Sequence, residues 1–283
     1  MLTERRNLKR ILLFFLLIFI GLVSIVFSEA ITLRIDQPKI RLRIPQRSAE
    51  SGEIFAYNPS EKTIKVKIYL EDWVFSSTAD GSKIFYPPGT TGLSCAKWIS
   101  FAPAEFTISP YGKQSVNYTV NCPDDAQGGH YAVMFFETAL GETMDEEGVS
   151  VMVLGRLGAL FYIEPAGTIK REARLENLTV VKNEGINIKL DFLNTGNIDI
   201  TPEGTFYIMD EEAIIAARGK FNKVYTLPQD KAVISASISE ENASQIPCGE
   251  YDLIITIDLG GIPRVLEARL NIEPSGKISY SLP

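Results

Sequence analysis

The chain has 283 residues, a formal net charge of −7 and 45% hydrophobic residues, and its sequence pI is about 5.0. This length suits about two domains, each large enough to bury its own core. The acidic balance, without a run of Lys or Arg beyond the N-terminus, argues against nucleic acid as a partner.

Residues 1–30 have the pattern of a secretory signal peptide. A basic head containing Arg5 and Arg6 precedes an unbroken apolar stretch, 11–27, and the small residues Ser28 and Ala30 follow. The alternative is an uncleaved membrane anchor, because the apolar stretch is longer than most signal cores but short for a span. We expect an exported protein of the periplasm or cell surface, contacting the membrane only through this segment if it is uncleaved.

From Ile31 the sequence consists of short alternating runs of apolar and polar residues, separated by turn residues, as β-strands require. Pro38 predicts an edge strand broken by a kink, and the Gly/Ser/Thr/Pro-rich residues 76–97 predict a long loop. The strands expected here are 31–35, 40–45, 53–57, 63–73, 98–101, 106–108, 115–121, 131–138 and 148–165.

The last of these runs, 148–165, is apolar on both faces. At ~3.3 Å per residue it would extend roughly 50 Å, about twice the usual strand length. We therefore expect Gly155 and Gly158 to bend or bulge it into two segments. It closes the first domain.

The same run predicts a partner-binding edge strand formed by Val149, Val151, Val153 and Arg156. Across residues 149–163 the only charge is Arg156, and there is no Pro, whereas natural edge strands carry such guards. We expect the three valines to face a groove between the two sheets that accepts a partner's strand. A core strand buried in its own sandwich is the alternative.

The second half repeats the pattern, with a hairpin across residues 183–185. The strands expected here are 171–181, 186–193, 198–201, 205–209, 224–227, 232–239, 249–259 and 264–272. The fold class is therefore all-β, with two tandem immunoglobulin-like β-sandwich domains, 31–165 and 166–274, after the N-terminal signal peptide. We expect residues 275–283 to form a loose polar tail.

Both halves contain a Gly-x-Tyr corner, ending in Tyr131 and Tyr251. A tyrosine at this place in an immunoglobulin-like fold buries its ring and donates its hydroxyl hydrogen to upstream backbone. We expect both tyrosines to do so.

Several segments of the first half resemble the N-terminal domain of PapD-like periplasmic pilus-assembly chaperones. The resemblance covers roughly residues 40–165 as a spacing of strands and turns. Its segments are Asn58-Pro-Ser, Trp73, Phe106-Thr-Ile-Ser-Pro-Tyr-Gly, Gly128-Gly-His-Tyr-Ala-Val-Met-Phe-Phe136 and Ala159-Leu-Phe-Tyr-Ile-Glu-Pro165.

The resemblance implies a chaperone that binds an envelope or pilus-type protein subunit by β-strand edge pairing. In that family two basic residues hold the carboxylate at the subunit's C-terminus. Arg41 or Arg43 would stand for the first of them, as a possible carboxylate anchor. The expected Lys of the long strand falls near Leu160, and Glu164 replaces a basic residue before the final Pro. These departures favour an envelope protein outside the usual pilus systems.

Catalytic, metal and cofactor residues are not predicted. The single histidine, His130, begins an expected strand and has no flanking motif of a nucleophilic site. One His and three widely spaced Cys give no zinc pattern, and no Gly-rich phosphate motif leads from a strand into a helix.

The second function open to this sequence is a structural or adhesive envelope module that recognises polysaccharide or protein through loops. Two-domain surface proteins that bind peptidoglycan in Gram-positive bacteria have a similar first domain. Trp73, Trp98, Phe85 and Tyr86 would line such a groove under residues 76–97, although core packing is the favoured role of these aromatics.

Cys95 and Cys122 are candidates for a disulfide. They share one expected domain of an exported protein, while Cys248 lies in the other. The alternative is three free thiols that pack as small apolar side chains.

Overall fold

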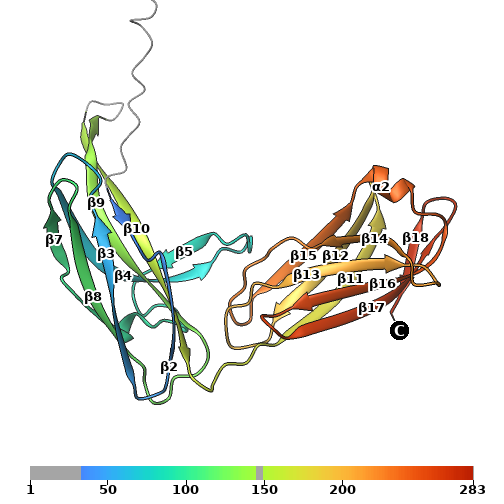
Figure 1. Ribbon diagram of the computed structural model, residues 1–283, viewed down its shortest axis with the longest axis horizontal. Coiled ribbons are helices and arrows are strands. Elements are labelled where there is room, and N and C mark those ends of the chain that lie inside the picture. Colours follow the sequence, from blue (N-terminus) through green and yellow to red (C-terminus); the bar gives the residue numbers. More distant parts are fainter. Residues whose placement is uncertain (1–32, 145–148, 283) are drawn as a thin grey trace, which may run out of the picture.

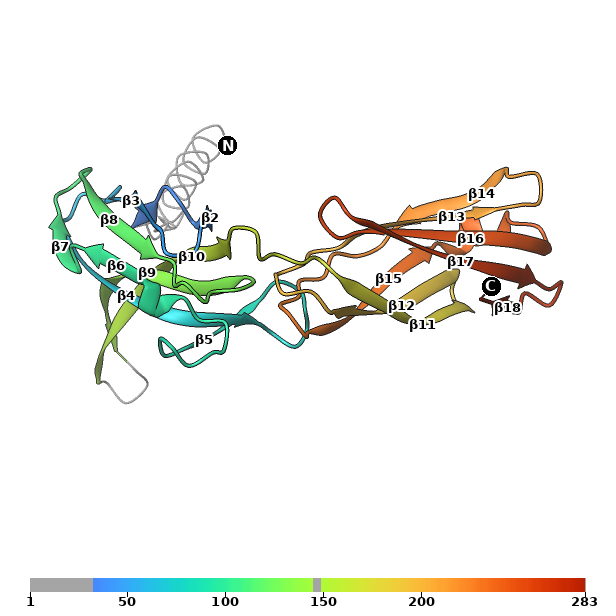
Figure 2. The ribbon, with the colours of Figure 1, turned by 90° about the horizontal axis from the view of Figure 1, so that it is seen from below.

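The structure is a computed structural model that describes residues 33–144 and 149–282. The predicted signal peptide or anchor lies outside the described residues. Two β-sandwiches are joined at an angle and together form a bent, elongated molecule (Figures 1 and 2). Within the described ranges, no helix combines the length and the hydrophobicity needed to cross a membrane.

The first sandwich packs a four-stranded sheet, β1-β3-β8-β6, against a second sheet, β2-β10-β9-β4-β5, in which β7 also pairs with β4. Apolar residues of both inner faces form one core between the sheets. The elements are β1 (Arg34–Ile35), β2 (Lys39–Ile44), β3 (Ala49–Tyr57), β4 (Ile64–Phe75), β5 (Lys83–Tyr86), η1 (Ala96–Trp98), β6 (Ile99–Ala102), β7 (Glu105–Ile108), β8 (Lys113–Asn121), β9 (His130–Met144) and β10 (Ser150–Pro165).

The predicted kink at Pro38 is present and moves the chain from one sheet to the other. Before it, β1 pairs antiparallel with β3, and after it β2 pairs parallel with β10. Proline suits the crossing because it cannot donate a ladder hydrogen bond. The chain's first two strands therefore cover one edge of each sheet.

The predicted division of the long strand at Gly155 and Gly158 is wrong. β10 is one strand of 16 residues, and the single register shift falls between Val153 and Leu154, where Leu140 is the extra residue on β9. The side chain of Leu140 fills the space beside Gly155, within 3.0 Å of where a Cβ would lie. The glycine thus admits the bulge of the neighbouring strand and does not bend its own.

Residues 76–97, expected to be a loop, contain β5 and turns held by one buried carboxylate. Asp72 of β4 is fully buried and accepts hydrogen bonds from the backbone N–H groups of Gly89 and Thr91, at 3.1 and 2.8 Å. The hydroxyls of Thr91 and Ser94 donate to it as well. Because a buried carboxylate needs such donors, this cluster ties residues 89–94 to the sheet.

The second sandwich packs a three-stranded sheet, β11-β12-β15, against a five-stranded sheet, β14-β13-β16-β17-β18. Its core is a separate apolar cluster. The elements are β11 (Ala173–Lys182), β12 (Ile186–Asn194), β13 (Glu203–Met209), β14 (Ile215–Lys220), β15 (Lys231–Ile238), α2 (Glu240–Ser244), β16 (Gly249–Asp258), β17 (Pro263–Ile272) and β18 (Ile278–Ser281).

The sequence-based strands of this half need three corrections. β14 was not predicted, and the expected strands 198–201 and 224–227 form only one isolated bridge, between Ile200 and Thr226. The expected loose tail contains β18, which pairs with β17, and the Tyr280 hydroxyl donates to the Leu178 carbonyl. β14 and β18 are short hairpin partners of β13 and β17 without a clear alternation of apolar residues, and the Tyr280–Leu178 bond joins segments that are distant in sequence, so local alternation did not reveal them. The hairpin between β11 and β12 is as predicted.

Candidate partner-binding edge and interdomain cleft

One edge of β10 is covered only in part. On one side, β10 pairs with β9 from Ser150 to Ile163. On the other side, β2 pairs with it only from Leu160 to Pro165. Among the described residues, no strand pairs with that second side over residues 150–159. Backbone hydrogen-bonding groups of a ten-residue stretch therefore line an open strand edge.

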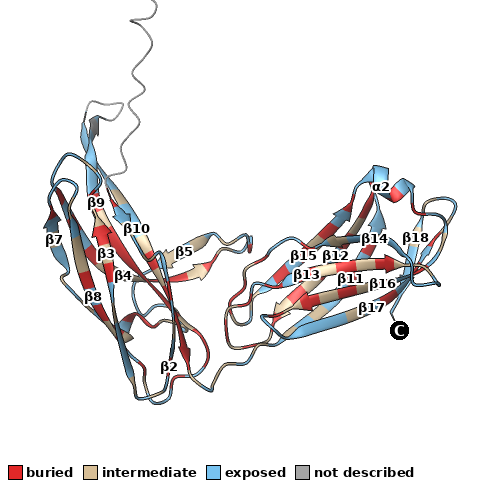
Figure 3. Ribbon diagram, viewed as in Figure 1, coloured by how far each residue is buried: buried red, intermediate tan, exposed pale blue. Residues whose placement is uncertain are grey.

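The predicted valines lie at this edge and are exposed. Val149, Val151 and Val153 are 56%, 41% and 40% exposed. Because side chains alternate along a strand, they share a face with Ala159 and Phe161, which are buried in the core between the sheets. Figure 3 shows the change from buried to exposed along β10. The valines therefore extend the inner face of the sheet beyond the part that the opposite sheet covers.

Arg156 does not lie on the valines' face. Its guanidinium donates to Glu71 of β4 at 3.1 Å and stacks over the ring of Phe135 of β9, 4.0 Å from the ring centroid. These contacts hold the side chain against the outer face of its own sheet. The sequence placed Arg156 in the same strand segment as the valines, and the alternation of the strand separates them.

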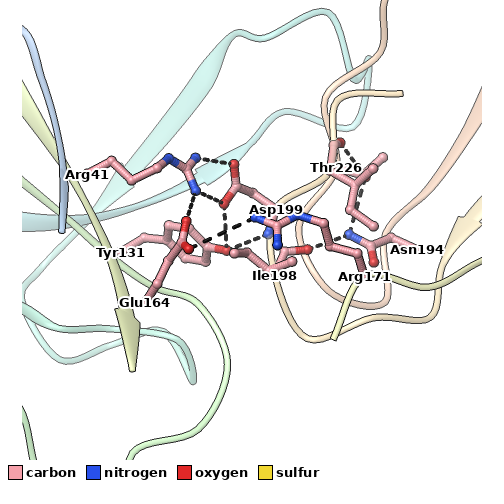
Figure 4. Close-up of polar contacts among 9 residues, drawn as sticks. Arg41, Tyr131, Glu164, Arg171, Asn194, Ile198, Asp199 and Thr226 are labelled. Carbon is pink, nitrogen blue, oxygen red and sulfur yellow. Dashed lines mark hydrogen bonds and ion pairs between the residues drawn. The ribbon is translucent and has the colours of Figure 1, made fainter. Parts of the chain in front are cut away.

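Arg41 of β2 lies at the junction of the two sandwiches (Figure 4). Its guanidinium forms a bidentate pair with Asp199 of the second sandwich, at 2.6 and 3.2 Å, and a short ion pair with Glu164 at the end of β10. Arg171 approaches the other oxygen of Glu164 at 4.0 Å. Two arginines and two carboxylates thus form a balanced charge cluster between the domains.

The carboxylates of this cluster already pair with Arg41, which the sequence analysis gave as a possible carboxylate anchor. Burial alone would lower the pKa of Arg41, but the hydrogen bonds and charges of Asp199 and Glu164 raise it above the ordinary value. A third carboxylate at Arg41 would have to displace one of these partners. Arg43 is exposed farther along β2, outside this cluster.

The two corner tyrosines differ. The Tyr251 hydroxyl donates to the Pro247 carbonyl at 2.8 Å, so its predicted bond to upstream backbone is confirmed. The prediction is wrong for Tyr131, whose hydroxyl accepts the Asp199 N–H at 2.7 Å and faces the same residue's carboxylate. Burial and that carboxylate raise the pKa of Tyr131. The corner of the first sandwich therefore binds the second sandwich.

Two cations beside the aromatic cluster of Trp73 and Tyr162 have no carboxylate partner in the part of the chain that the structure describes. Lys39 lies over the ring of Tyr162, and Lys83 lies over Trp73 and Phe75, with ammonium-to-centroid distances of 4.5 to 5.5 Å. Among the described residues neither forms an ion pair. Burial, and then the charge of Lys39, lower the pKa of Lys83. Both effects disfavour its charge, and a bound anion would offset them.

Sequence reasoning missed Lys83 because it lies inside the expected loop. Its alternation with Phe85, which faces the same side of β5, was the available signal. Trp73 is buried in an aromatic cluster with Tyr131 and Tyr162, so its favoured core role is confirmed, while Tyr86 is exposed.

The predicted disulfide is absent from the structure: Cys95 and Cys122 are free, buried thiols. The backbone around each is tied elsewhere, since the Cys95 N–H donates to Tyr131 and the Cys122 N–H donates to Ser48. Burial raises the pKa of both thiols. Cys248 is exposed.

His130 begins β9, and its ring stacks on Trp98 with a centroid separation of 4.3 Å. Both ring nitrogens are buried, and neither has a hydrogen-bond partner among the described residues. Burial lowers the pKa of His130. A neutral, packed imidazole fits these surroundings.

No family model matches the sequence, and no curated protein matches it. Among solved structures, the chain is similar to one described as a chaperone–tip adhesin complex in CFA/I fimbriae biogenesis, at 13% identity, covering 83% of this chain and 97% of that chain, with a TM-score of 0.47. It is similar to the class 5 fimbriae chaperone CfaA, at 14% identity, 88% and 98% coverage and a TM-score of 0.43. It is also similar to a structure of the Salmonella enterica SafA pilin with the SafB chaperone, at 11% identity, 82% and 94% coverage and a TM-score of 0.41.

Proposed function

We propose that this protein is a non-enzymatic, exported envelope chaperone that holds an extended segment of a partner protein at the open edge of β10. The observation that carries the proposal is that no strand of the described ranges, 33–144 and 149–282, pairs with the second side of residues 150–159, whose side chains are largely apolar and exposed. A partner strand would complete the sheet with main-chain hydrogen bonds. Its apolar side chains would cover the valines.

An open apolar edge of this length favours a regular occupant. Exposed edges without charges, prolines or bulges invite aggregation, and large exposed apolar patches mark interaction sites. The bulge near this edge lies on β9, at Leu140, and leaves the free side of β10 unprotected. The one charge of this edge, Arg156, is held over Phe135 and by Glu71, so the apolar face that carries the valines has no charged guard.

The start of β2 sets the point at which a bound partner strand must end. The β2 pairing begins where Lys39 lies opposite Leu160, so a strand that fills the edge stops there. Lys39 contacts the ring of Tyr162, and Lys83 stands nearby over Trp73. Two cations at this end, neither of which forms an ion pair with another described residue, suit a C-terminal carboxylate. We assign the anchor to this pair instead of Arg41 or Arg43, and the partner to an envelope or pilus-type protein subunit.

The test replaces the valines without removing the strand. We expect Val151→Thr with Val153→Thr to keep the melting temperature within about 4 °C, since both side chains are exposed and Thr suits strands. Pull-down of the partner from the native envelope should fall at least tenfold, because Thr buries poorly.

The matched control is Val233→Thr with Val265→Thr, two exposed valines on β15 and β17 of the second sandwich. It should leave partner recovery unchanged. A double edge variant that melts normally and retains every envelope partner excludes strand capture, and one that loses its cooperative melt shows that the valines serve the core.

A further inference from the structure

The hairpin of β4 and β5 leaves the first sandwich, and its tip, residues 76–82, reaches the second sandwich (Figures 1 and 2). We propose that this hairpin is a strap that fixes the angle between the two sandwiches and thereby sets the position of Lys83. The fixing of the angle is independent of the proposed function, whereas the role of Lys83 rests on that function.

The tip inserts a residue into the core of the other domain. Ala79 is 7% exposed and belongs to the apolar cluster of the second sandwich, together with Val224 and Ala232. Its carbonyl accepts the Tyr225 N–H at 2.8 Å. The second sandwich is therefore completed by a side chain and a backbone acceptor of the first.

The tip is shaped for this contact by its own hydrogen bonds. The Ser82 N–H donates to the Asp80 carboxylate at 2.8 Å, and the Ser76 N–H donates to the Ser82 carbonyl at 2.8 Å. Ala79 has a φ of 52°, in the left-handed region, and Gly81 has a φ of 95°. A Cβ at Gly81 would lie 3.0 Å from the Tyr225 ring. The turn is thus preformed and closely covered.

A second contact lies at the base of the strap. The rings of Phe75 and Tyr225 are 5.6 Å apart, and Leu227 is buried in the aromatic cluster that contains Trp73 and Tyr162. A third contact is the pair of Arg41 and Asp199. Domains joined by a linker alone normally move relative to each other, whereas separate contacts at the tip, the base and the ion pair remove that freedom.

Lys83 follows the tip directly. Its ammonium donates to the Gly81 carbonyl at 2.9 Å while it lies over Trp73 and Phe75. Displacement of the tip would therefore shift this cation relative to Lys39 on β2. The strap links the angle between the sandwiches to the spacing of the proposed carboxylate anchor.

The test undocks the tip in the full chain. Ala79→Asp places a charge in the second core, and Tyr225→Ala removes the covering ring from the other side. Ala79→Gly is the matched control, because glycine adopts a left-handed φ readily. Backbone ¹⁵N relaxation should give one tumbling time for the wild type and the control. Both disrupted variants should give different times for the two sandwiches, and small-angle scattering should show a broader shape distribution.

A peptide arm tests the link to Lys83. An alternating Val/Thr ten-residue peptide with a free C-terminus should bind the wild type at least tenfold more tightly than its amide, and Ala79→Asp should lose that preference. Unchanged tumbling in folded Ala79→Asp and Tyr225→Ala variants overturns the strap. Changed tumbling with an intact carboxylate preference overturns only the link to Lys83. Failure of the wild type to bind the peptide contradicts the proposed function, while the relaxation result still decides the strap.

Discussion

The two sandwiches treat their sheet edges differently. In the second sandwich, the edge strand β11 carries a bulge at Asn177. The other edge strand of that sheet, β15, is covered at Ser235, whose carbonyl accepts the Asn222 N–H and whose N–H donates to the Asn222 side-chain oxygen. The edge strand β14 carries the exposed charged side chains of Arg218 and Lys220. The other edge strand of that sheet, β18, has only four residues. All four are devices that prevent strand addition. The first sandwich has short edge strands as well, except along residues 150–159 of β10. This contrast singles out residues 150–159 as the edge that the described part of the chain leaves least protected, which is the edge proposed to bind a partner.

The corner tyrosines show the same division. Tyr251 bonds within its own sandwich, while Tyr131 bonds to Asp199 of the other. The corner of the second sandwich therefore bonds within its own domain, whereas the corner of the first bonds to the neighbouring domain. One motif therefore serves internal stability in one copy and domain assembly in the other.

The largest effect is expected from removing guards of the second sandwich. Arg218→Val with Lys220→Val would make the β14 edge as apolar as that of β10, so we expect concentration-dependent self-association at micromolar concentrations beyond that of the wild type. Analytical ultracentrifugation measures it. The control is Arg174→Val, on β11, whose edge retains its bulge. Equal sedimentation of wild type and double variant would contradict the edge comparison.

The corner tyrosines should differ in stability. Tyr131→Phe leaves the Asp199 N–H without its acceptor and should lower the free energy of unfolding by about 2 kcal/mol, against about 1 kcal/mol for Tyr251→Phe, which loses one bond to a carbonyl. Chemical denaturation measures both. Only Tyr131→Phe should separate the unfolding of the two sandwiches into distinct transitions. A single transition in both variants would show that Tyr131 does not hold the domains together.

A smaller effect is expected from the protonation of His130 in the first sandwich. The pKa of His130 is lowered in the folded state, so the unfolded state binds more protons below pH ~6.5 and stability falls as pH decreases through that value. The nearby backbone of Gln127 and Ser94, and then the charge of Asp125, oppose this lowering of the pKa. His130→Phe, which keeps a ring against Trp98, should flatten the slope of stability just below pH ~6.5. An unchanged slope would mean that other groups control it.

The smallest effect is expected from thiol modification, which should differ between the buried cysteines of the first sandwich and the exposed cysteine of the second. In the native protein a thiol reagent should modify Cys248 alone, because burial raises the pKa of the other two thiols and shields them. In denaturant without reductant it should modify three. One modified cysteine in denaturant would restore the predicted disulfide of Cys95 and Cys122.

Sequence patterns predicted the strands well where alternation was long and local. Tyr251, Leu253, Ile255 and Ile257 were expected on one face of β16, and all four are buried. Val149, Val151 and Val153 were expected on one face of a strand that binds a partner in a groove between the sheets. They share a face and are exposed, and their role in binding stays a prediction. Alternation in the sequence shows which side chains share a face of a strand, and this does not depend on which other strand it pairs with.

Pairing between distant segments could not be predicted in the same way. Arg41 forms its ion pair with Asp199, which lies far along the chain in the other sandwich. Tyr131 was given the role of Tyr251 because the local motif is the same, but its acceptor and donor are set by the domain junction. Lys83 was hidden by turn residues on both sides. The contacts of Arg41 and Tyr131 depend on the angle between two domains, which no local pattern records.

The short strand β1 has a mechanical consequence. It is held by two residue pairs with β3, with Arg34 stacked on Tyr57, while β2 is held by six pairs with β10. Tension applied through the N-terminal segment meets β1 first, and Pro38 separates it from β2. Such a load would peel β1 from its sheet at low force while β2 still resisted in shear. The first sandwich would thus yield beside its open edge before its core or its junction with the second sandwich felt the pull.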